Sequence, residues 1–254
     1  MVHSISHRIY RRVRQLTRLP PEALRSLLPS FSQFGEDHAM LRLLRPQPQG
    51  TFVDVGANDP LEGSNTAFLY SLGWSGLAID PNPQFAAKFR KARPRDTYLT
   101  MGVAETPSTL TYYEFEYDKF NTFSEERANL IAADGNPLKG QHAVECRSLR
   151  DIVGEHLPGR HVDLLSVDCE GLDLEVLRSA GLDDMRPTVL IVEDFEGFRG
   201  FQAGRREGAL DEFLRGAGYL PVCQLAWSAI YVAQDWRRLP QGAFRFPEEM
   251  GYLP

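Results

Sequence analysis

The sequence has few cysteines and no long apolar stretch, and both shortages narrow the classes of protein it can encode. Its three cysteines, Cys146, Cys169 and Cys223, show no CxxC spacing, so we expect reduced core or strand residues in a cytoplasmic protein. No apolar run approaches the ~20 residues that a membrane span needs. No apolar signal segment stands near residue 1, so secretion is not expected.

An excess of positive charge is also missing. The formal net charge of −6 argues against non-specific binding of nucleic acid by the whole chain. The chain is 43% apolar and 24% charged, as in ordinary globular proteins, and its 254 residues suffice for one large α/β domain. The composition therefore predicts a globular protein that does not bind nucleic acid.

Positive charge is nevertheless concentrated in residues 1–30, which hold six arginines and a single acid, Glu22. Apolar residues recur there at helical spacing, namely Ile5, Ile9, Val13 and Leu16. One interpretation is a basic amphipathic helix that contacts an anionic membrane surface or a membrane glycosylation complex. The other is a solvated arm or a helix packed across the domain, which is favoured because Leu19-Pro20-Pro21 breaks the helix early.

Two consecutive apolar segments carry the strongest functional signal. In TFVDVGANDP, residues 51–60, an apolar strand runs into a glycine turn. In GLAIDPNP, residues 76–83, a second strand ends in Asp80, 26 residues after Asp54. An α/β sheet builds a nucleoside site in this way, because the glycine lets backbone approach the ligand and the acid accepts hydrogen bonds from ribose hydroxyls.

The glycine turn lacks two of the three glycines that bind a dinucleotide. It reads Gly56-Ala57-Asn58-Asp59-Pro60, and without the second and third glycines a dinucleotide fits poorly, because those glycines let the backbone approach the pyrophosphate. S-adenosylmethionine has no phosphate and needs one close approach, at Gly56, while Asp54 can orient its positively charged methionine end. We therefore favour S-adenosylmethionine. There are two alternatives. One is a NAD or nucleotide-sugar enzyme on the same sheet, against which the lack of a YxxxK-type pair also argues. The other is a non-catalytic nucleoside-binding module.

The order of apolar segments predicts the fold. Expected strands cover 51–55, 76–79, 97–105, 108–118, 142–149, 162–168, 187–194, 219–225 and 229–234. The first expected helix begins near residue 32 or 36. Further helices are expected at about 64–72, 83–92, 149–156, 172–180 and 207–217, with a short one inside 121–139. We predict an α/β, Rossmann-like, seven-stranded methyltransferase sheet, mostly parallel with a C-terminal antiparallel hairpin, plus an inserted β segment. The domains would be a basic arm, 1–30, and a single methyltransferase domain, 31–254.

These segments resemble the FkbM-type S-adenosylmethionine-dependent O-methyltransferases. The matching pieces are SQFGEDHAMLRLL (32–44), the stretch 51–83, NTFSEE (121–126) and DLLSVDCEGLDLEVLRSAG (163–181). The resemblance covers roughly 31–234, and VDCEGLDLEVL is its most specific part. It implies methyl transfer to a hydroxyl, often on a sugar of a polysaccharide, glycolipid or secondary metabolite.

The resemblance also implies roles for residues. Cofactor contacts would fall on Asp54, Gly56, Asn58 and Asp80. The segment 32–37, with Gln33 and Glu36, would lie across the cofactor mouth, and Gly102 and Val103 would lie near the adenine.

Carboxylates follow two neighbouring parallel strands. One strand ends in Asp168-Cys169-Glu170 and the next in Glu193-Asp194, so four carboxylates would converge unless a cation or protons relieve their repulsion. Oxygen ligands suit Mg²⁺ or another hard divalent cation. We predict a metal site of Asp168, Glu193 and Asp194, which is similar to that of macrolide-sugar O-methyltransferases. Alternatively, Glu170 caps the following helix and Glu193 pairs with an arginine.

The general base is left open by the sequence. We expect a catalytic or substrate role for Asp168 or Glu170, with His142 or His38 as candidate bases, although a lone histidine is more often structural. Aromatics of the insertion could form a wall for a sugar ring or simply pack within strands; these are Tyr112, Tyr113, Phe115, Tyr117, Phe120 and Phe123, together with the amide of Asn121. The Gly- and Phe-rich loop 195–205 could close over the acceptor.

Overall fold

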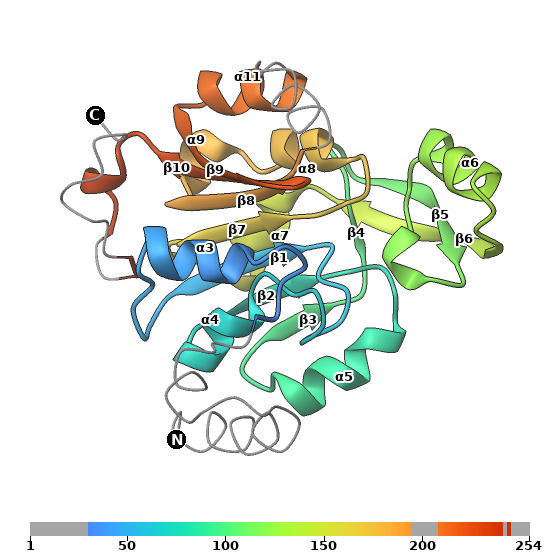
Figure 1. Ribbon diagram of the computed structural model, residues 1–254, viewed down its shortest axis with the longest axis horizontal. Helices are drawn as coiled ribbons and strands as arrows, with labels where there is room; N and C mark the ends of the chain where they lie inside the picture. Colours follow the sequence, from blue (N-terminus) through green and yellow to red (C-terminus); the bar gives the residue numbers. More distant parts are fainter. Residues whose placement is uncertain (1–29, 195–207, 241–242, 245–254) are drawn as a thin grey trace, which may run out of the picture.

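Two β-sheets organise the protein in the computed structural model, which describes residues 30–194, 208–240 and 243–244 (Figure 1). Three predicted features fall outside these residues: the basic arm up to residue 29, the loop 195–205 and most of the tail after residue 240.

The larger sheet has seven strands in the order β3-β2-β1-β7-β8-β10-β9. Its strands are β1 Thr51–Val55, β2 Ser75–Ile79, β3 Thr97–Leu99, β7 Leu164–Val167, β8 Val189–Glu193, β9 Tyr219–Leu225 and β10 Ser228–Ala233. The first five run parallel, and β10 is antiparallel to both of its neighbours. The predicted methyltransferase sheet is confirmed, and the carboxyl ends of β1, β2, β7 and β8 meet at one edge.

Helices cover both faces of this sheet, so its central strands are apolar on both sides. On one face lie α3 Glu36–Leu43, α4 Ala67–Leu72 and α5 Gln84–Ala92, and on the other lie α7 Leu149–His156, α8 Asp173–Ser179 and α11 Ala209–Gly216. Alternate residues of β1 supply the two cores, because Phe52 packs with α3 and α4 while Val53 packs with the opposite helices. The central strands β1 and β7, whose tips lie at the carboxyl edge of the sheet, are thus buried along their whole length.

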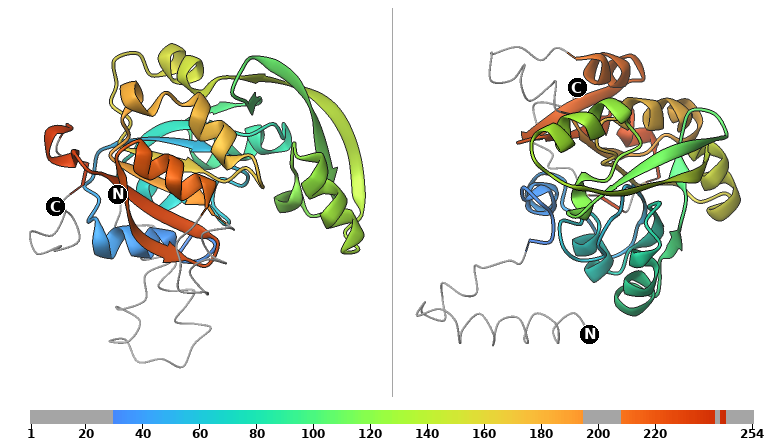
Figure 2. Two further views of the ribbon diagram at one scale, coloured as in Figure 1. Left: turned by 90° about the horizontal axis from the view of Figure 1, so that it is seen from above. Right: turned by 90° about the vertical axis from the view of Figure 1, so that its right-hand side faces the viewer.

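The smaller sheet is built from the predicted insertion and projects from one side of the domain (Figures 1 and 2). It contains β4 Gly102–Val103, β5 Ser108–Phe115 and β6 Leu138–Arg147 in the order β4-β6-β5, with β5 and β6 antiparallel. Between β5 and β6 the chain forms η1 Asp118–Phe120 and α6 Glu125–Ala133. We call the segment from β5 to β6 the inserted hairpin.

One predicted strand, 97–105, is divided between the two sheets. Its first part is β3 in the large sheet, and its second part, β4, pairs with β6 in the small one. Where the chain passes from β3 to β4, Gly102 is tightly surrounded. A β-carbon on it would overlap Sγ of Cys146 and lie 2.8 Å from the Phe123 ring. A glycine therefore lets the chain pass from one sheet to the other.

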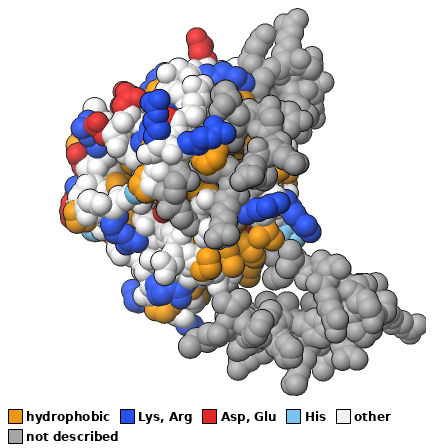
Figure 3. All heavy atoms as spheres, turned by 90° about the vertical axis from the view of Figure 1, so that its left-hand side faces the viewer, with side chains coloured by type: hydrophobic (Ala, Val, Ile, Leu, Met, Phe, Trp, Pro, Cys, Tyr) orange, Lys and Arg blue, Asp and Glu red, His pale blue; other side chains and the backbone are white. Residues whose placement is uncertain are grey.

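The remaining elements are short, and the surface is mixed. They are α9 Leu182–Met185 and η2 Trp236–Arg238. On the face in Figure 3, Lys and Arg side chains are spread among apolar and neutral ones. Within the described ranges, every helix is too short or too polar to cross a bilayer.

Candidate active site

An open cavity lies at the carboxyl edge of the large sheet, with about 940 Å³ of empty space that includes the solvent at its mouth. Its walls come from the turn after β1, the tips of β2 and β7, the strand β4 and the inserted hairpin. The predicted cofactor residues that line it are Gln33, Asp54, Gly56, Asn58, Asp80, Gly102 and Val103. The fold thus brings them to one place, and their roles in binding stay predictions.

Gly56 begins the turn with a φ of +78°, a conformation that favours glycine. A β-carbon there would overlap the carbonyl oxygen of Asp168, the residue that follows the neighbouring strand β7. The glycine is therefore required by the sheet itself, in addition to any ligand that approaches the turn. Two residues later Asn58 also has a positive φ of 45°, and its N–H points back to Asp80.

Asp80 is held at the tip of β2 by two backbone donors. Its Oδ1 accepts the N–H of Asn82 at 2.8 Å, and its Oδ2 accepts the N–H of Asn58 at 3.0 Å. Burial raises its pKa to about 6. Each carboxylate oxygen can accept a further hydrogen bond, so the side chain is oriented to receive two hydroxyl donors from the cavity.

Asp54, on β1, is a buried residue of the cavity wall. It accepts the hydroxyl of Thr66 at 2.5 Å, and burial raises its pKa although Thr66 and Arg93 oppose the shift. Arg93 in turn donates to the Thr66 hydroxyl at 2.9 Å. The residues 64–66, predicted as helix, are outside α4 because their polar side chains serve this network and the cavity wall.

The segment before α3 adjoins the cavity, and the predicted place of residues 32–37 across a cofactor mouth stays a prediction. Asp37 folds it by accepting hydrogen bonds from the Ser30 hydroxyl, the Phe31 N–H and the Ser32 hydroxyl. Gln33 faces the cavity. Glu36 does not line the cavity; it is buried and accepts the N–H of Phe34 at 2.8 Å. Its position indicates a structural role in this segment.

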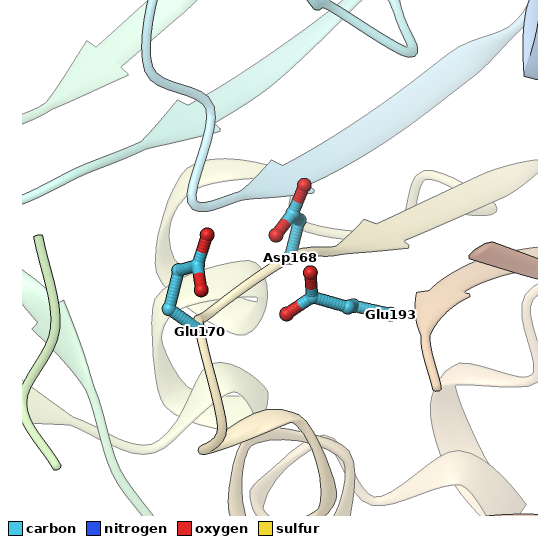
Figure 4. Close-up of side chains that lie close together, drawn as sticks. All are labelled: Asp168, Glu170 and Glu193. Carbon is cyan, nitrogen blue, oxygen red and sulfur yellow. The ribbon is translucent and has the colours of Figure 1, made fainter. Parts of the chain in front are cut away.

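Three carboxylates converge beside the glycine turn, from the tips of β7 and β8 (Figure 4). Asp168, Glu170 and Glu193 each offer an oxygen, and these oxygens lie within 4.8 Å of one another. We call these residues the acid trio. Asp194, which the sequence placed in this group, is not among them, and its N–H donates to the Trp227 carbonyl at 2.6 Å.

Neighbouring side chains fix the loop that carries the acid trio. Glu170 has a positive φ of 49°, an uncommon conformation for a residue with a side chain. Asp173 accepts the N–H groups of Cys169 and Gly171 at 2.9 and 3.2 Å, so Asp173, and not Glu170, satisfies the backbone before α8. Arg127 of the inserted hairpin forms an ion pair with Glu170 at 2.9 Å.

The acid trio is crowded with negative charge. Burial, and then the neighbouring carboxylates, raise the pKa of Asp168 and of Glu193. Burial also raises the pKa of Glu170, although Arg127 opposes this. Oε2 of Glu193 is buried and has no hydrogen-bond partner within the described ranges. A buried, unsatisfied carboxylate oxygen in an all-oxygen group fits a hard divalent cation.

The candidate histidines and aromatics divide between cavity and packing. His142 is an exposed residue of β6 whose ring meets that of Tyr112 on the neighbouring strand, and it does not line the cavity. Tyr112 and Phe123 do line it, with ring centroids 4.9 Å apart. Tyr113, Phe115 and Phe120 instead pack with α6. His38 lies on α3, outside the cavity lining.

Several residues that the sequence did not single out also contribute. Asp118, Lys119 and Thr122 enter the cavity wall from the inserted hairpin, and Asn65 enters from the turn before α4. The sequence around these residues is polar, as in any surface loop, so their place in the cavity wall could be recognised only from the fold. Asp173, by contrast, had a usable signal, because it directly follows the Glu170-Gly171-Leu172 turn.

The sheet order and the position of the cavity define the class of Rossmann-like methyltransferases. Residues 54–221 match the Methyltransferase FkbM domain. The chain therefore belongs to the FkbM methyltransferase family. A comparison with curated proteins gave no match.

Proposed function

We propose that this protein is an S-adenosylmethionine-dependent O-methyltransferase that methylates a hydroxyl of a sugar-containing acceptor. The observation that carries the proposal is one cavity lined by Asp80, at the tip of β2, and by Asp168 and Glu170 of the acid trio, after β7, with the Gly56 turn of β1 between them. A nucleoside bound at Asp80 would extend over Gly56 toward the carboxylates. An acceptor hydroxyl held by those carboxylates would then face the methyl group.

The donor half of the cavity suits S-adenosylmethionine. Asp80 would accept both ribose hydroxyls, Gly102 and Val103 would contact the adenine, and Asp54 would attract the positive charge of the methionine end. When bound, S-adenosylmethionine supplies an activated methyl group on a sulfonium. The chain contributes by fixing distance and orientation, which is a large part of the rate in such transfers.

The acceptor half suits a polyol. Tyr112 and Phe123 offer ring faces to the apolar side of a sugar, and the Thr122 hydroxyl lies beside them in the wall. Asp168 would accept the proton of the reacting hydroxyl. Asp168, Glu170 and Glu193 would hold Mg²⁺ or a similar cation, which lowers the pKa of a bound hydroxyl when present.

Calorimetry with the full-length chain tests the donor assignment. S-adenosylhomocysteine should bind with micromolar or better affinity and NAD should not bind, each measured with Mg²⁺ and with EDTA. Binding of NAD alone would overturn the proposal. Transfer of labelled methyl groups to a panel of glycosides, with catechols as comparison, then tests the acceptor class, and transfer to catechols only would contradict a sugar acceptor.

A further inference from the structure

The cavity has a pronounced imbalance of charge. Six acids line it, and these are Asp54, Glu62, Asp80, Asp118, Asp168 and Glu170. Among the described lining residues, Lys119 is the single Lys or Arg. The inserted hairpin brings this lysine in through η1, the short helix that follows β5.

Lys119 is available to a ligand. The residue is half-buried, and no hydrogen bond or ion pair joins its ammonium to another part of the chain that the structure describes. By contrast, Arg127 of the same hairpin is paired with Glu170, and Lys88 at the outer surface is paired with Asp59. A half-buried cation that no carboxylate of the described chain pairs with directly is solvated by water and can form an ion pair with an anionic ligand.

The position of Lys119 is equally specific. Its Nζ lies 2.9 Å from the point that a β-carbon on Gly63 would occupy, and Gly63 has a φ of +74°. Ser32 forms a bridge with the same glycine. A shallower hollow next to the main cavity is lined by residues 30–33, 61–63 and Lys119. Lys119 therefore stands at the end of the cavity that Gln33 and Gly63 close.

The charges of the donor match this arrangement. S-adenosylmethionine carries two positive groups, the sulfonium and the ammonium, and one negative group, the carboxylate. The acids of the cavity suit the first two, and among the described lining residues Lys119 is the one cation that can form a charge-assisted hydrogen bond with the third. If the ribose lies at Asp80 and the sulfonium faces the acid trio, the amino-acid part extends across the Gly56 turn toward Gln33 and Gly63.

We infer that Lys119 binds the carboxylate of the donor's amino-acid part, and that the inserted hairpin thereby contributes a donor-binding residue to the sheet's nucleoside site. The inference rests on the proposed function, since it assumes the S-adenosyl donor. It assigns to the hairpin a role in donor binding that is separate from contact with the acceptor.

Two ligands can test the role of Lys119 separately from the proposed function on which the inference rests. S-adenosylhomocysteine has the amino acid, whereas 5′-methylthioadenosine keeps the nucleoside and thioether without it. In Lys119→Gln, calorimetry should show S-adenosylhomocysteine binding weakened by about 10- to 100-fold and methylthioadenosine binding nearly unchanged, because only the first ligand loses a charge-assisted hydrogen bond. Lys119→Arg should keep most of the affinity. Lys139→Gln, on the exposed face of β6, is the matched control and should bind both ligands as the parent does.

The other outcomes are informative in different ways. Equal losses for both ligands would assign Lys119 to the shape of the hairpin and overturn the inference. Unchanged S-adenosylhomocysteine affinity, with a higher KM for the acceptor, would assign the lysine to an acceptor anion and overturn it too. If neither ligand bound the parent protein, the proposed function itself would have failed.

Discussion

Gly56 and Asp168 meet backbone to backbone, and a β-carbon on residue 56 would overlap the carbonyl oxygen of Asp168. The turn where we propose that the donor binds and the strand tip that begins the acid trio are therefore packed as one unit. A change in either should be felt in the other.

Gly56→Ala tests this contact. The variant should lose at least tenfold in S-adenosylhomocysteine affinity and unfold at a lower temperature, because the β7 tip must move away from the added methyl group. Gly135→Ala is the matched control, since Gly135 has a similar φ of +90° but open space around it. It should cost only the ~1–2 kcal/mol of a left-handed residue. Equal effects of the two substitutions on stability and affinity would contradict the close packing.

The affinity for S-adenosylhomocysteine should depend on pH through Asp80. Its pKa is raised by burial from 3.8 to about 6, and hydroxyl donors prefer the ionised form. Affinity should therefore rise with pH up to about 6 and then level off. The stability of the ligand-free protein should show the opposite dependence on pH. A carboxyl group whose pKa is raised in the folded state contributes stability at low pH, and this contribution is lost as the pH rises through about 6.

Asp163 provides the control for that profile. Burial raises its pKa to about 6 as well, but it accepts the Thr51 N–H at the amino end of the sheet, far from the cavity edge. Asp163→Asn should reduce the loss of stability between about pH 4 and 7 and leave the affinity profile unchanged. Calorimetry and urea unfolding across this range measure both quantities. An affinity in the parent that is flat from pH 5 to 8 would contradict the role of Asp80.

Removal of divalent cations should abolish methyl transfer, and added Mg²⁺ should restore it. Glu193→Gln should raise the Mg²⁺ concentration for half-maximal activity by about tenfold or more, since a charged oxygen ligand is replaced by a neutral one. Glu126→Gln, on the exposed side of α6, is the control and should behave as the parent. Full activity of the parent after exhaustive chelation would contradict the metal site.

The ion pair of Arg93 with Asp96 should be a major support of the fold. Both side chains are 0% exposed, and the guanidinium also donates to Ser64 and Thr66 next to the cavity. Arg93→Met should lower the free energy of unfolding by about 3–5 kcal/mol, because Asp96 is left charged and buried.

The exposed pair of Arg150 with Asp184 offers the comparison. Each side chain is 65% exposed, so Arg150→Met should change stability by about 0.5 kcal/mol or less. Urea unfolding of both variants measures the difference. Similar small losses would show that the buried arginine is replaceable by apolar packing.

The sheet could be predicted from the sequence because its signals are local. Apolar runs such as 162–168 and 187–194 end in acids, and the close of the chain shows two short strands around a tight turn. Strand 97–105 was predicted as continuous because nothing local marks where it changes partner. That change depends on the contact of Gly102 with Cys146, which is distant in sequence.

The acid trio was predicted only in part, for a geometrical reason. Successive residues of a strand point to opposite sides, so Glu193 and Asp194 cannot both face Asp168. The structure selects Glu193, and Glu170 completes the group because its positive φ turns the loop back toward the strand tip. Lys119 could not be found from sequence, since its place depends on the path of the inserted hairpin.

The passage of one chain segment from β3 in the large sheet to β4 in the small sheet joins the inserted hairpin to the large sheet. β4 forms the wall at Gly102 and Val103 and is at the same time an edge strand beside β6. The hairpin is therefore not a detachable module. Transplanting it from a relative to change the acceptor would also rebuild the cavity wall at Gly102 and Val103, where we propose that the adenine binds, so acceptor and donor selectivity in this protein should be inherited and engineered together.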